Sequence, residues 1–343
     1  MTHRFPIKEV ALQAGLSTAT VDRVLNNRAH ISPQTKRRVV DAISELEGQE
    51  KQLSARGRRM FVDFVVEAPE RFSREIRKST ETVLPTVNQA VIRPRFNFKE
   101  RMSGNACAAI LKRIAKRGSQ GVCIKARDLP EIRAGISELV AKGIPVVTLF
   151  TDISNSDRLA YAGLDNLKAG RTAAYLMANL IKGHDGAVLT TKSDTLFEGE
   201  DERFRGFSEI MTKLRPEINL IDTSGGAGLN TPTARRIELA LSKTKDIRGV
   251  YSMGGGNTAI QHVFDRLDLK PEIFIAHDLD DDNLRLLRDE KITIVLQHDL
   301  REDIRNAFLH IMSKHKIITL PDHLTTSDIQ VITPMNIPTQ FDD

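Results

Sequence analysis

The chain has 343 residues, 40% of them hydrophobic, which is enough for two or three domains with apolar cores. No segment approaches the ~20 consecutive apolar residues of a membrane span, so no membrane association is expected. The first residues, MTHRFPIKEVALQAG, lack the apolar stretch and cleavage site of a signal peptide. Cys107 and Cys123 follow no metal-binding spacing, and the sequence therefore predicts a cytoplasmic protein with reduced thiols.

The net positive charge is concentrated at the N-terminus. Residues 1–60 contain 11 Lys and Arg against 6 Asp and Glu, a net charge of +5 that equals the net charge of the whole chain. The remaining 283 residues carry 39 charges of each sign. A small basic head on a neutral body is typical of a DNA-binding domain joined to a larger domain.

Three amphipathic helices are predicted in this basic head. The first covers residues 7–14, where apolar side chains recur at helical spacing, and Gly15 supplies the turn after it. The second covers residues 18–25 with Ser17 as its N-cap, and the third runs from Pro33 to about Leu46. This order predicts a helix-turn-helix, whose second helix enters the major groove of DNA. The alternative is that the three helices have no role in binding DNA. The positive charge, the glycine turn and the helix spacing all agree with a helix-turn-helix and disfavour this alternative.

From about Met60 the pattern changes to short β-rich runs that alternate with amphipathic helical segments. The β-rich runs are residues 61–66, 90–92, 121–125, 144–150, 186–191, 249–253, 272–277 and 293–298. This alternation predicts an α/β body of parallel sheets with helices on both faces. So long a segment favours two similar lobes, with a ligand site between them beyond the carboxyl ends of the strands.

Motifs for catalysis, cofactors and metals are absent from the sequence. The run Gly254-Gly255-Gly256 lacks the Lys-Ser/Thr that completes a phosphate-binding loop. The acidic run at 277–283, HDLDDDN, lacks the spacing of a calcium loop and suits the N-terminus of a helix. No serine-hydrolase or zinc-protease motif occurs. We therefore expect no enzyme activity, no cofactor and no metal.

The head resembles a known family in the string IKEVALQAGLSTATVDRVLNNRAHISPQTKRRV, residues 7–39. This string is similar to the headpiece of the LacI/GalR family of bacterial regulators, and the resemblance covers about the first 50 residues. It implies that Thr18, Ala19 and Arg23 read base edges in the major groove, and the arginine fork suits guanine. It also implies phosphate contacts, which position the protein without reading sequence, from Ser17, Asn26 and His30.

Two of these residues could instead have a purely structural role. Thr18 could serve only as a solvated residue at the start of the helix, and Arg23 could pair with Asp22. Lys36, Arg37 and Arg38 are expected to form a solvated face with weak attraction to phosphates.

The head also departs from the family pattern. Asp22 stands where many members have Ser, and Pro6 stands where many have a Thr cap. In the predicted linker, residues 49–60, Leu53 is apolar but Gly57 falls where a leucine usually wedges into the minor groove. A standard leucine wedge is therefore not expected. Phosphate or minor-groove contacts remain open for Arg56, Arg58 and Arg59.

The body resembles the periplasmic-binding-protein fold that LacI/GalR regulators use as an effector domain. The resemblance is carried, in order, by residues 144–152, 161–176, 202–207, 254–259 and 277–279, followed by Gln297. It implies a helix-turn-helix domain at 1–48 and an effector domain at 61–343. The effector domain would have two subdomains, 61–162 with 292–325 and 163–291 with 326–340.

Six residues are the predicted effector ligands. The resemblance places five of them at the family's effector positions: Asp152, Arg203, Asn257, Asp278 and Gln297. Carboxylate, guanidinium and amide groups suit vicinal hydroxyls, because each hydroxyl both donates and accepts a hydrogen bond. Each of the five could instead serve as a cap, a turn residue or a surface ion pair. Phe72, after the first strand, could stack on a sugar face, although surface or core packing is the alternative.

The resulting hypothesis is that the protein is a homodimeric transcriptional regulator that binds a pseudopalindromic operator in double-stranded DNA. A repressor is favoured over an activator. A sugar or polyol would control its DNA affinity. The alternative effector is a purine or other nucleobase, which the low aromatic content of 5% disfavours. A solute-binding protein would require a signal peptide and no basic head, and an enzyme would require the motifs that are missing.

Overall fold

The computed structural model describes residues 5–26, 28, 31–55, 59–321, 324 and 326–341, with only the backbone for 48–55 and 340. Four predictions concern residues outside this range: His30, Arg56, Gly57 and Arg58. The side chain of Leu53 also lies outside it. The head and the body are described separately below.

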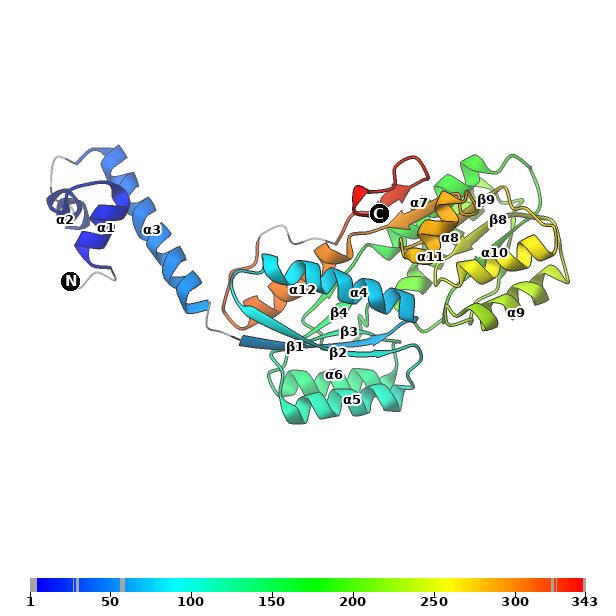
Figure 1. The fold of residues 1–343 in the computed structure, drawn as a ribbon, viewed down its shortest axis with the longest axis horizontal. Coiled ribbons are helices and arrows are strands. Elements are labelled where there is room, and N and C mark those ends of the chain that lie inside the picture. The colour runs from blue at the N-terminus through cyan, green and yellow to red at the C-terminus, as the bar shows by residue number, and fades with distance from the viewer. Residues whose placement is uncertain are drawn as a thin grey trace. The chain divides into compact units, whose positions relative to one another are not determined.

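Three helices form the head, as the sequence predicted (Figure 1). They are α1 (Ile7–Ala14), α2 (Thr18–Leu25) and α3 (Pro33–Ala55). Gly15 ends α1 in the left-handed conformation, φ 62°, and the hydroxyl of Ser17 caps α2 by accepting a hydrogen bond from the amide of Thr20 at 3.2 Å. The head core consists of Val10, Ala11, Ala14, Val21, Val24, Val39 and Ala42.

The third helix is longer than the sequence predicted. It continues to Ala55, whereas the expected end was near Leu46, so residues 49–55 of the predicted linker are helical. The added residues, 47–55, read EGQEKQLSA, in which Glu, Gln, Lys, Leu and Ala are good helix formers and only Gly48 is unfavourable. The apolar periodicity of the sequence ends near Leu46, before the end of the helix, which explains the difference.

The first lobe of the body is built on a sheet in the order β2-β1-β3-β4-β5. Its strands are β1 (Arg59–Glu67), β2 (Val91–Lys99), β3 (Gly121–Lys125), β4 (Val146–Leu149) and β5 (Ala160–Ala162). The pairs β1–β3, β3–β4 and β4–β5 are parallel. Its helices include α4 (Glu70–Val83), the short η1 (Leu84–Thr86), α5 (Gly104–Arg117) and α6 (Pro130–Ala141).

The second lobe is built on a sheet in the order β11-β10-β9-β8-β6-β7. Its strands are β6 (Ala187–Thr191), β7 (Asn219–Asp222), β8 (Ile247–Ser252), β9 (Ile273–His277), β10 (Ile294–Gln297) and β11 (Gln330–Ile332). Its helices are α7 (Asn166–Leu180), α8 (Glu198–Leu214), α9 (Asn230–Leu241), α10 (Asn257–Arg266) and α11 (Asp281–Arg288). The pairs among β6 to β10 are parallel and β11 is antiparallel to β10, so the predicted α/β class is confirmed.

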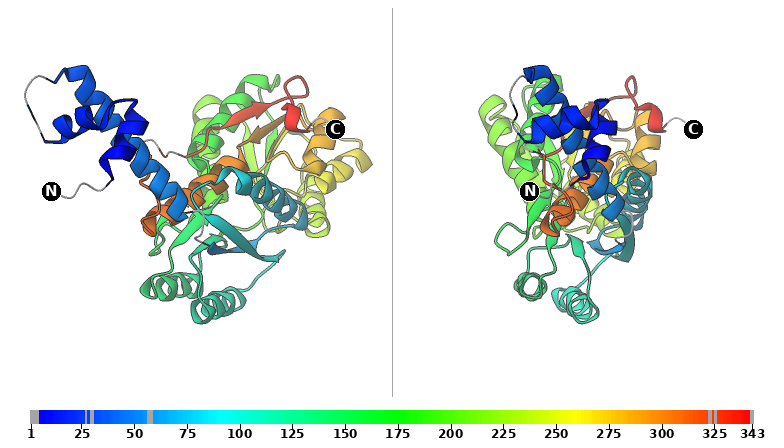
Figure 2. Two further views of the ribbon diagram at one scale, coloured as in Figure 1. Left: turned by 60° about the vertical axis from the view of Figure 1, so that its left-hand side comes forward. Right: turned by 90° about the vertical axis from the view of Figure 1, so that its left-hand side faces the viewer.

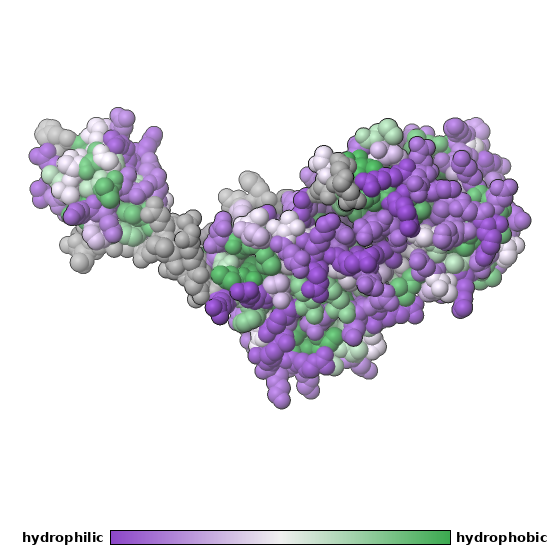
Figure 3. All heavy atoms as spheres, viewed as in Figure 1, coloured by the Kyte–Doolittle hydropathy of each residue, from purple (hydrophilic) through white to green (hydrophobic). Residues whose placement is uncertain are grey.

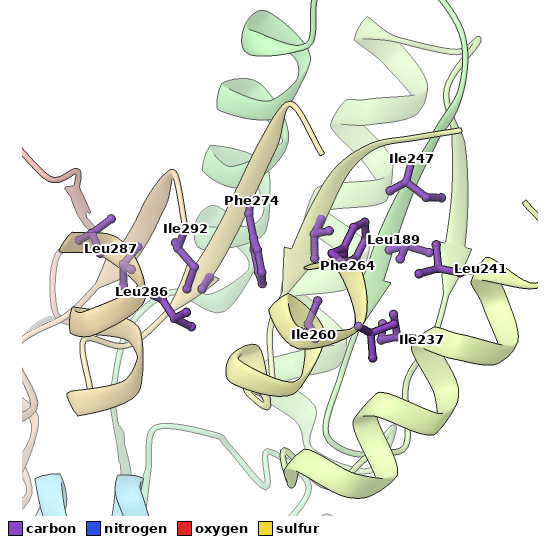
Figure 4. Close-up of a cluster of buried hydrophobic side chains, with 14 of the residues drawn as sticks. Leu189, Ile237, Leu241, Ile247, Ile260, Phe264, Phe274, Leu286, Leu287 and Ile292 are labelled. Atoms are coloured by element: carbon purple, nitrogen blue, oxygen red, sulfur yellow. The ribbon is translucent and has the colours of Figure 1, made fainter. Parts of the chain in front are cut away.

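One core of the second lobe lies between its sheet and the helices α9, α10 and α11 (Figure 4), and another lies between the sheet and the helices α7 and α8. Leu189 and Phe274 point from the strands toward Ile260 and Phe264 of α10. All four are buried, with at most 2% of the surface exposed. Burial of this kind holds the carboxyl ends of β8 and β9 at fixed positions.

The chain crosses between the lobes at a later point than the sequence predicted. The first crossing follows β5, near the expected residue 162, but β10 pairs with β9 in the second sheet, with Ile294 opposite Ile275. The crossing expected near residue 291 therefore comes after Gln297. The apolar run of β10 is buried beside β9 and completes the sheet, which explains why it stays in the second lobe.

Helix α12 (Leu300–Lys314) then returns to the first lobe, where it packs against α4, β4 and β5 (Figures 1 and 2). The chain later re-enters the second lobe, where β11 pairs with β10.

Candidate DNA-binding helix and effector cleft

Helix α2 presents one polar face to solvent. Thr18, Ala19 and Arg23 are exposed, whereas Val21 and Val24 point into the head core. The three predicted base-reading residues therefore share an accessible face of a capped helix, which is the arrangement that major-groove readout requires. Their contact with bases stays a prediction.

Asp22 does not engage Arg23 in the head. Its carboxylate lies 3.5 Å from Arg28 and accepts a hydrogen bond from the side-chain amide of Asn26 at 2.8 Å. The same amide also donates to the carbonyl of Asp22 at 2.9 Å. A phosphate contact by the Asn26 side chain, as predicted, would thus require these bonds to break.

Arg38 has a structural role that the sequence did not indicate. Its guanidinium donates to the carbonyl oxygens of Ala14 at 2.7 Å and Gly15 at 3.3 Å. These are the carbonyls at the end of α1, so Arg38 ties α3 to the turn between α1 and α2. Lys36 and Arg37 are exposed, as expected for a solvated face.

A cavity of about 440 Å³ lies between the two lobes of the body. Small-molecule sites usually measure ~300–1,000 Å³, so the cavity suits a ligand the size of a monosaccharide or nucleobase. The first lobe contributes Glu67, Arg71, Phe72, Lys125, Arg127 and Phe150. The second lobe contributes Ser193, Phe197, Glu200, Arg203, Met253, Asp278, Asp280 and Asn283.

Three of the six predicted effector residues line this cavity: Phe72, Arg203 and Asp278. Phe72 comes from α4 of the first lobe, and its ring lies 5.5 Å from that of Phe150 in an edge-to-face arrangement. Asp278 directly follows β9, with a left-handed backbone at φ 62°. The cavity thus brings together three residues far apart in sequence.

The other three predicted effector residues are engaged elsewhere. Asp152 makes a two-pronged ion pair with Arg158 and accepts hydrogen bonds from Thr148 at 2.6 Å and from the amide of Ile153 at 2.8 Å. Gln297 accepts from the amide of Leu279 at 2.6 Å. These partners use the groups that an effector would need, so the structure does not support a ligand role for Asp152 or Gln297.

Asn257 is buried behind the cavity wall rather than in it. Its side chain donates to Oδ1 of Asn283 at 2.7 Å, and Asn283 lines the cavity. The amide of Asn283 in turn donates to the carbonyl oxygens of His277 at 2.9 Å and Asp278 at 2.7 Å. Asn257 therefore supports the loop that carries Asp278, and its direct contact with an effector stays a prediction.

Arg203 is held at the cavity by two fixed acceptors. Its Nε donates to Asn166 at 2.8 Å and its Nη1 to the carbonyl of Met253 at 3.1 Å. Among the described residues, Nη2 has no hydrogen-bond acceptor. The close approach of α7 and α8 sets this position, since a Cβ added to Gly170 would lie 1.9 Å from the carbonyl oxygen of Arg203. The guanidinium is thus preorganised to donate into the cleft.

Lys125 and Glu200 are two half-buried groups of opposite charge at the cavity that the sequence analysis missed. Lys125 ends β3, and its ammonium donates to the carbonyl of Glu67 at 3.2 Å and lies 4.1 Å from the centre of the Phe197 ring. Burial lowers the pKa of Lys125 and raises the pKa of Glu200, and the attraction between the two charges opposes both shifts. Glu200 accepts two hydrogen bonds from Ser193. The ends of the predicted strands were the signal that could have revealed Glu67 and Lys125.

Charged contacts cross the mouth of the cleft. Arg71 of α4 lies 2.8 Å from the carboxylate of Asp280 in the second lobe and donates to the carbonyl of Gly228 at 3.0 Å. Arg127 lies 3.5 Å from Asp194 across the same cleft. Figure 3 shows hydrophilic side chains over both α4 and α11. Ion pairs are therefore among the contacts that join the two lobes across the cleft.

Within the described residues, no group of His, Cys, Asp and Glu side chains is arranged to hold a metal ion. The same part of the chain contains no helix long and apolar enough to cross a membrane.

Comparison with known families gives two matches. Residues 95–301, more than half of the chain, match the periplasmic binding protein domain, and residues 6–47 match the bacterial regulatory proteins of the lacI family. Neither family is enzymatic. A curated relative is the HTH-type transcriptional regulator RegA of Clostridium saccharobutylicum, 29% identical over 231 residues. The match covers 63% of this chain and 65% of the relative, slightly less than two thirds of its length.

Solved structures share the fold of the body. A glucose-galactose binding protein from Geobacillus stearothermophilus, GanP, superposes with a TM-score of 0.72 at 20% identity, covering 82% of this chain and 99% of that one. A solute-binding protein from Burkholderia graminis in complex with D-arabinose gives 0.73 at 19% identity, with 82% and 97% covered.

A third structure, a putative LacI transcriptional regulator from Bacteroides fragilis, gives a TM-score of 0.70 at 15% identity, with 81% of this chain and 98% of that one covered. The chain thus belongs to the periplasmic binding protein domain family and carries an N-terminal domain of the lacI family of bacterial regulatory proteins.

Proposed function

We propose that the protein is a cytoplasmic, sequence-specific transcriptional regulator. An effector bound in the cleft between the two lobes controls its affinity for DNA. The observation that carries this proposal is the union of two features in one chain. A capped helix exposes Thr18, Ala19 and Arg23, and a body cavity presents polar groups from both lobes. The relative RegA, by its name, is a regulator of the helix-turn-helix type. Two-fold symmetric dimers read two half-sites, so we propose a homodimer on a pseudopalindromic operator.

We propose a sugar or polyol as the effector. Asp278 offers a carboxylate acceptor, and Arg203 and Lys125 offer donors, while Phe72 and Phe197 offer apolar ring surfaces. Vicinal hydroxyls need acceptors and donors together, and the apolar faces of a sugar ring pack on aromatic rings. Two of the structural relatives are described as binding glucose and galactose or D-arabinose, which supports the same ligand class.

A nucleobase is the second candidate, and one observation favours it. Phe72, Phe150 and Phe197 all line the cavity, so a planar ring could stack there despite the low aromatic content of the chain. The polar groups on the opposite wall could then bind the edge of the base.

A thermal-shift panel of D-arabinose, D-galactose, D-glucose, common polyols and purines distinguishes the two candidates. A ligand that binds the native state raises the melting temperature, and the rise increases with the logarithm of the ligand concentration relative to its Kd. Stabilisation by a sugar or polyol that is lost in D278N supports the sugar effector. Stabilisation by purines alone would replace it with the nucleobase candidate, and no shift from any compound would contradict both.

A further inference from the structure

His298 lies on the crossover between the lobes and contacts two carboxylates. It follows β10 of the second lobe and precedes α12, which packs on the first lobe. Its Nδ1 lies 2.6 Å from Oδ2 of Asp303, in the first turns of α12, and its Nε2 lies 3.3 Å from Oδ1 of Asp278. The His298 and Asp303 side chains are 1% and 0% exposed. We call these three residues the Asp–His–Asp relay.

We propose that His298 positions the Asp278 carboxylate in the effector cleft and links it, through Asp303, to α12 of the first lobe. The inference rests on the proposed function, because it takes Asp278 to be an effector-binding group. It adds a positioning residue to the site, since His298 is not among the residues that line the cavity. It also gives a physical connection between a cleft residue of one lobe and a helix of the other.

The charge state of His298 follows from its two neighbours. A neutral imidazole donates from one ring nitrogen only, whereas an imidazolium donates from both and can serve two carboxylates. Burial alone would lower the pKa of His298, but the charge of Asp303 and the contacts with both carboxylates outweigh burial and raise the pKa to about 9. Burial would raise the pKa of Asp278, yet His298 holds it well below its ordinary value. Both groups are therefore charged at neutral pH.

The other groups around the relay do not take over the role of His298 beside the two carboxylates. Burial lowers the pKa of His277 well below its usual value, and its Nε2 lies 2.8 Å from the hydroxyl of Tyr251, so this imidazole is neutral. Burial also raises the pKa of Tyr161, next to the α12 carboxylate, so that phenol is neutral. Arg203 adds positive charge near the cleft carboxylate, and Phe150 places a ring 5.8 Å from the imidazole. The imidazole is thus the group of the relay that changes charge in mildly alkaline solution, while Lys125, whose pKa burial lowers, is a second cation facing Asp278.

The backbone of Asp278 is fixed independently of its carboxylate. Its φ of 62° lies in the left-handed region, and its carbonyl accepts the hydrogen bond from Asn283. With the main chain fixed, the direction of the carboxylate depends on what its oxygens contact. The 3.3 Å contact with His298 is a charge contact rather than a well-aligned hydrogen bond, so it orients one oxygen and leaves the other for a ligand.

The relay can be tested in the full-length protein by NMR with ¹³C-labelled aspartate carboxyl groups and ¹⁵N-labelled histidine. The Asp278 resonance is assigned by its loss in D278N. We expect H298Q to raise its titration midpoint by at least about one pH unit, because the half-buried carboxylate loses its cation. The matched control is H310Q, which changes a half-buried histidine of α12 outside the relay and should leave the midpoint unchanged.

D303N serves as a second variant, since it keeps the imidazole and removes one buried charge. It should lower the midpoint of His298 itself, as read from the ring ¹⁵N shifts. An unchanged Asp278 midpoint in H298Q, or a neutral His298 imidazole at pH 7 in the wild type, would overturn the relay.

Titration with D-arabinose then separates the relay from the sugar proposal. If D-arabinose binds the wild type, H298Q should bind it about tenfold more weakly than H310Q does, as expected for a carboxylate whose orientation is lost. Wild-type affinity should also fall above about pH 9, where the imidazolium is lost, and the fall should be smaller in H298Q, where only Lys125 still loses its charge. Equal affinities for H298Q and H310Q would overturn the positioning role. If no sugar binds the wild type, the sugar proposal fails, and the relay is judged by the carboxyl titration.

Discussion

At the scale of single residues, Arg23 offers the sharpest test of DNA reading. It is exposed on α2, and the neighbouring Asp22 is occupied by Arg28 and Asn26. We expect R23A to cost about 1–3 kcal/mol in binding to the preferred site, because a bidentate arginine contact to guanine is worth that much. Binding to unrelated DNA should change little.

The control for this prediction is R37A, which removes an exposed charge from α3. It should weaken binding to all sequences alike, since a phosphate contact carries no sequence information. Quantitative mobility shifts on both kinds of DNA provide the comparison. Equal losses on specific and unrelated DNA in R23A would contradict a base-reading role.

The relay histidine also predicts how stability depends on pH. Its pKa in the folded protein, about 9, lies above its ordinary value of 6.5. A group whose pKa is raised by folding stabilises the protein fully below its unfolded value, and this contribution is lost as the pH rises through the folded value. The free energy of unfolding should therefore decrease between about pH 6.5 and 9. Urea titrations at several pH values should show this decrease in the wild type and a smaller one in D303N.

The residues of the cleft were only partly predictable from the sequence. Arg203 and Asp278 follow recognisable tokens of the family pattern, and both line the cavity. In the sequence, Asp152 and Gln297 look equally suitable as effector ligands. In the fold, the carboxylate of Asp152 pairs with Arg158, and the side chain of Gln297 accepts a hydrogen bond from the amide of Leu279. Such pairings depend on side chains brought together by the fold, and sequence spacing does not report them.

At the scale of elements, the ion pair between α4 and the start of α11 is expected to hold the lobes together. Arg71 and Asp280 are 16% and 6% exposed, and their contact is 2.8 Å. Burial still raises the pKa of Asp280 despite Arg71, so the pair only partly offsets its desolvation. Removing the cation leaves a buried carboxylate without its partner, and we expect R71Q to lower the free energy of unfolding by about 3 kcal/mol.

A neighbouring pair provides the control. Arg74 and Asp281 connect the same two helices, but they are 59% and 76% exposed and 3.7 Å apart. R74Q should therefore change the stability by less than about 1 kcal/mol. Denaturant unfolding of both variants makes the comparison. If R71Q and R74Q lose equally little, Arg71 does not secure the cleft.

The β-rich runs of the sequence predicted the central strands of both sheets but not the full length of the edge strands. The buried runs at β3, β4, β6, β8, β9 and β10 coincide with predicted β-rich segments. The prediction at 90–92 captured only the start of β2, because in residues 93–99 the two phenylalanines are separated by charged and polar residues and by Pro94, so no continuous apolar run extends there. Proline is tolerated there because β2 is an edge strand. The short strands β5 and β11 likewise carry too few apolar residues for a periodic signal.

At the scale of the whole molecule, family membership and domain order were predictable, because the basic head and the α/β body differ in composition and in period. The crossing of the lobes was less predictable, since it depends on which sheet accepts β10. The Asp–His–Asp relay joins Asp278 in the cleft to Asp303 of α12, which packs on the first lobe. A change at the cleft can therefore affect both lobes.

The most direct test measures DNA binding with and without the effector. An operator duplex is first selected from random DNA by the full-length protein. Its affinity is then followed by fluorescence anisotropy, with and without the sugar or polyol that stabilises the protein most. We predict a two-fold symmetric site and a change in affinity of at least about fivefold, with the duplex changing the sugar affinity by the same factor. No preference for any sequence over random DNA, or an operator affinity that a bound sugar leaves unchanged, would contradict the account.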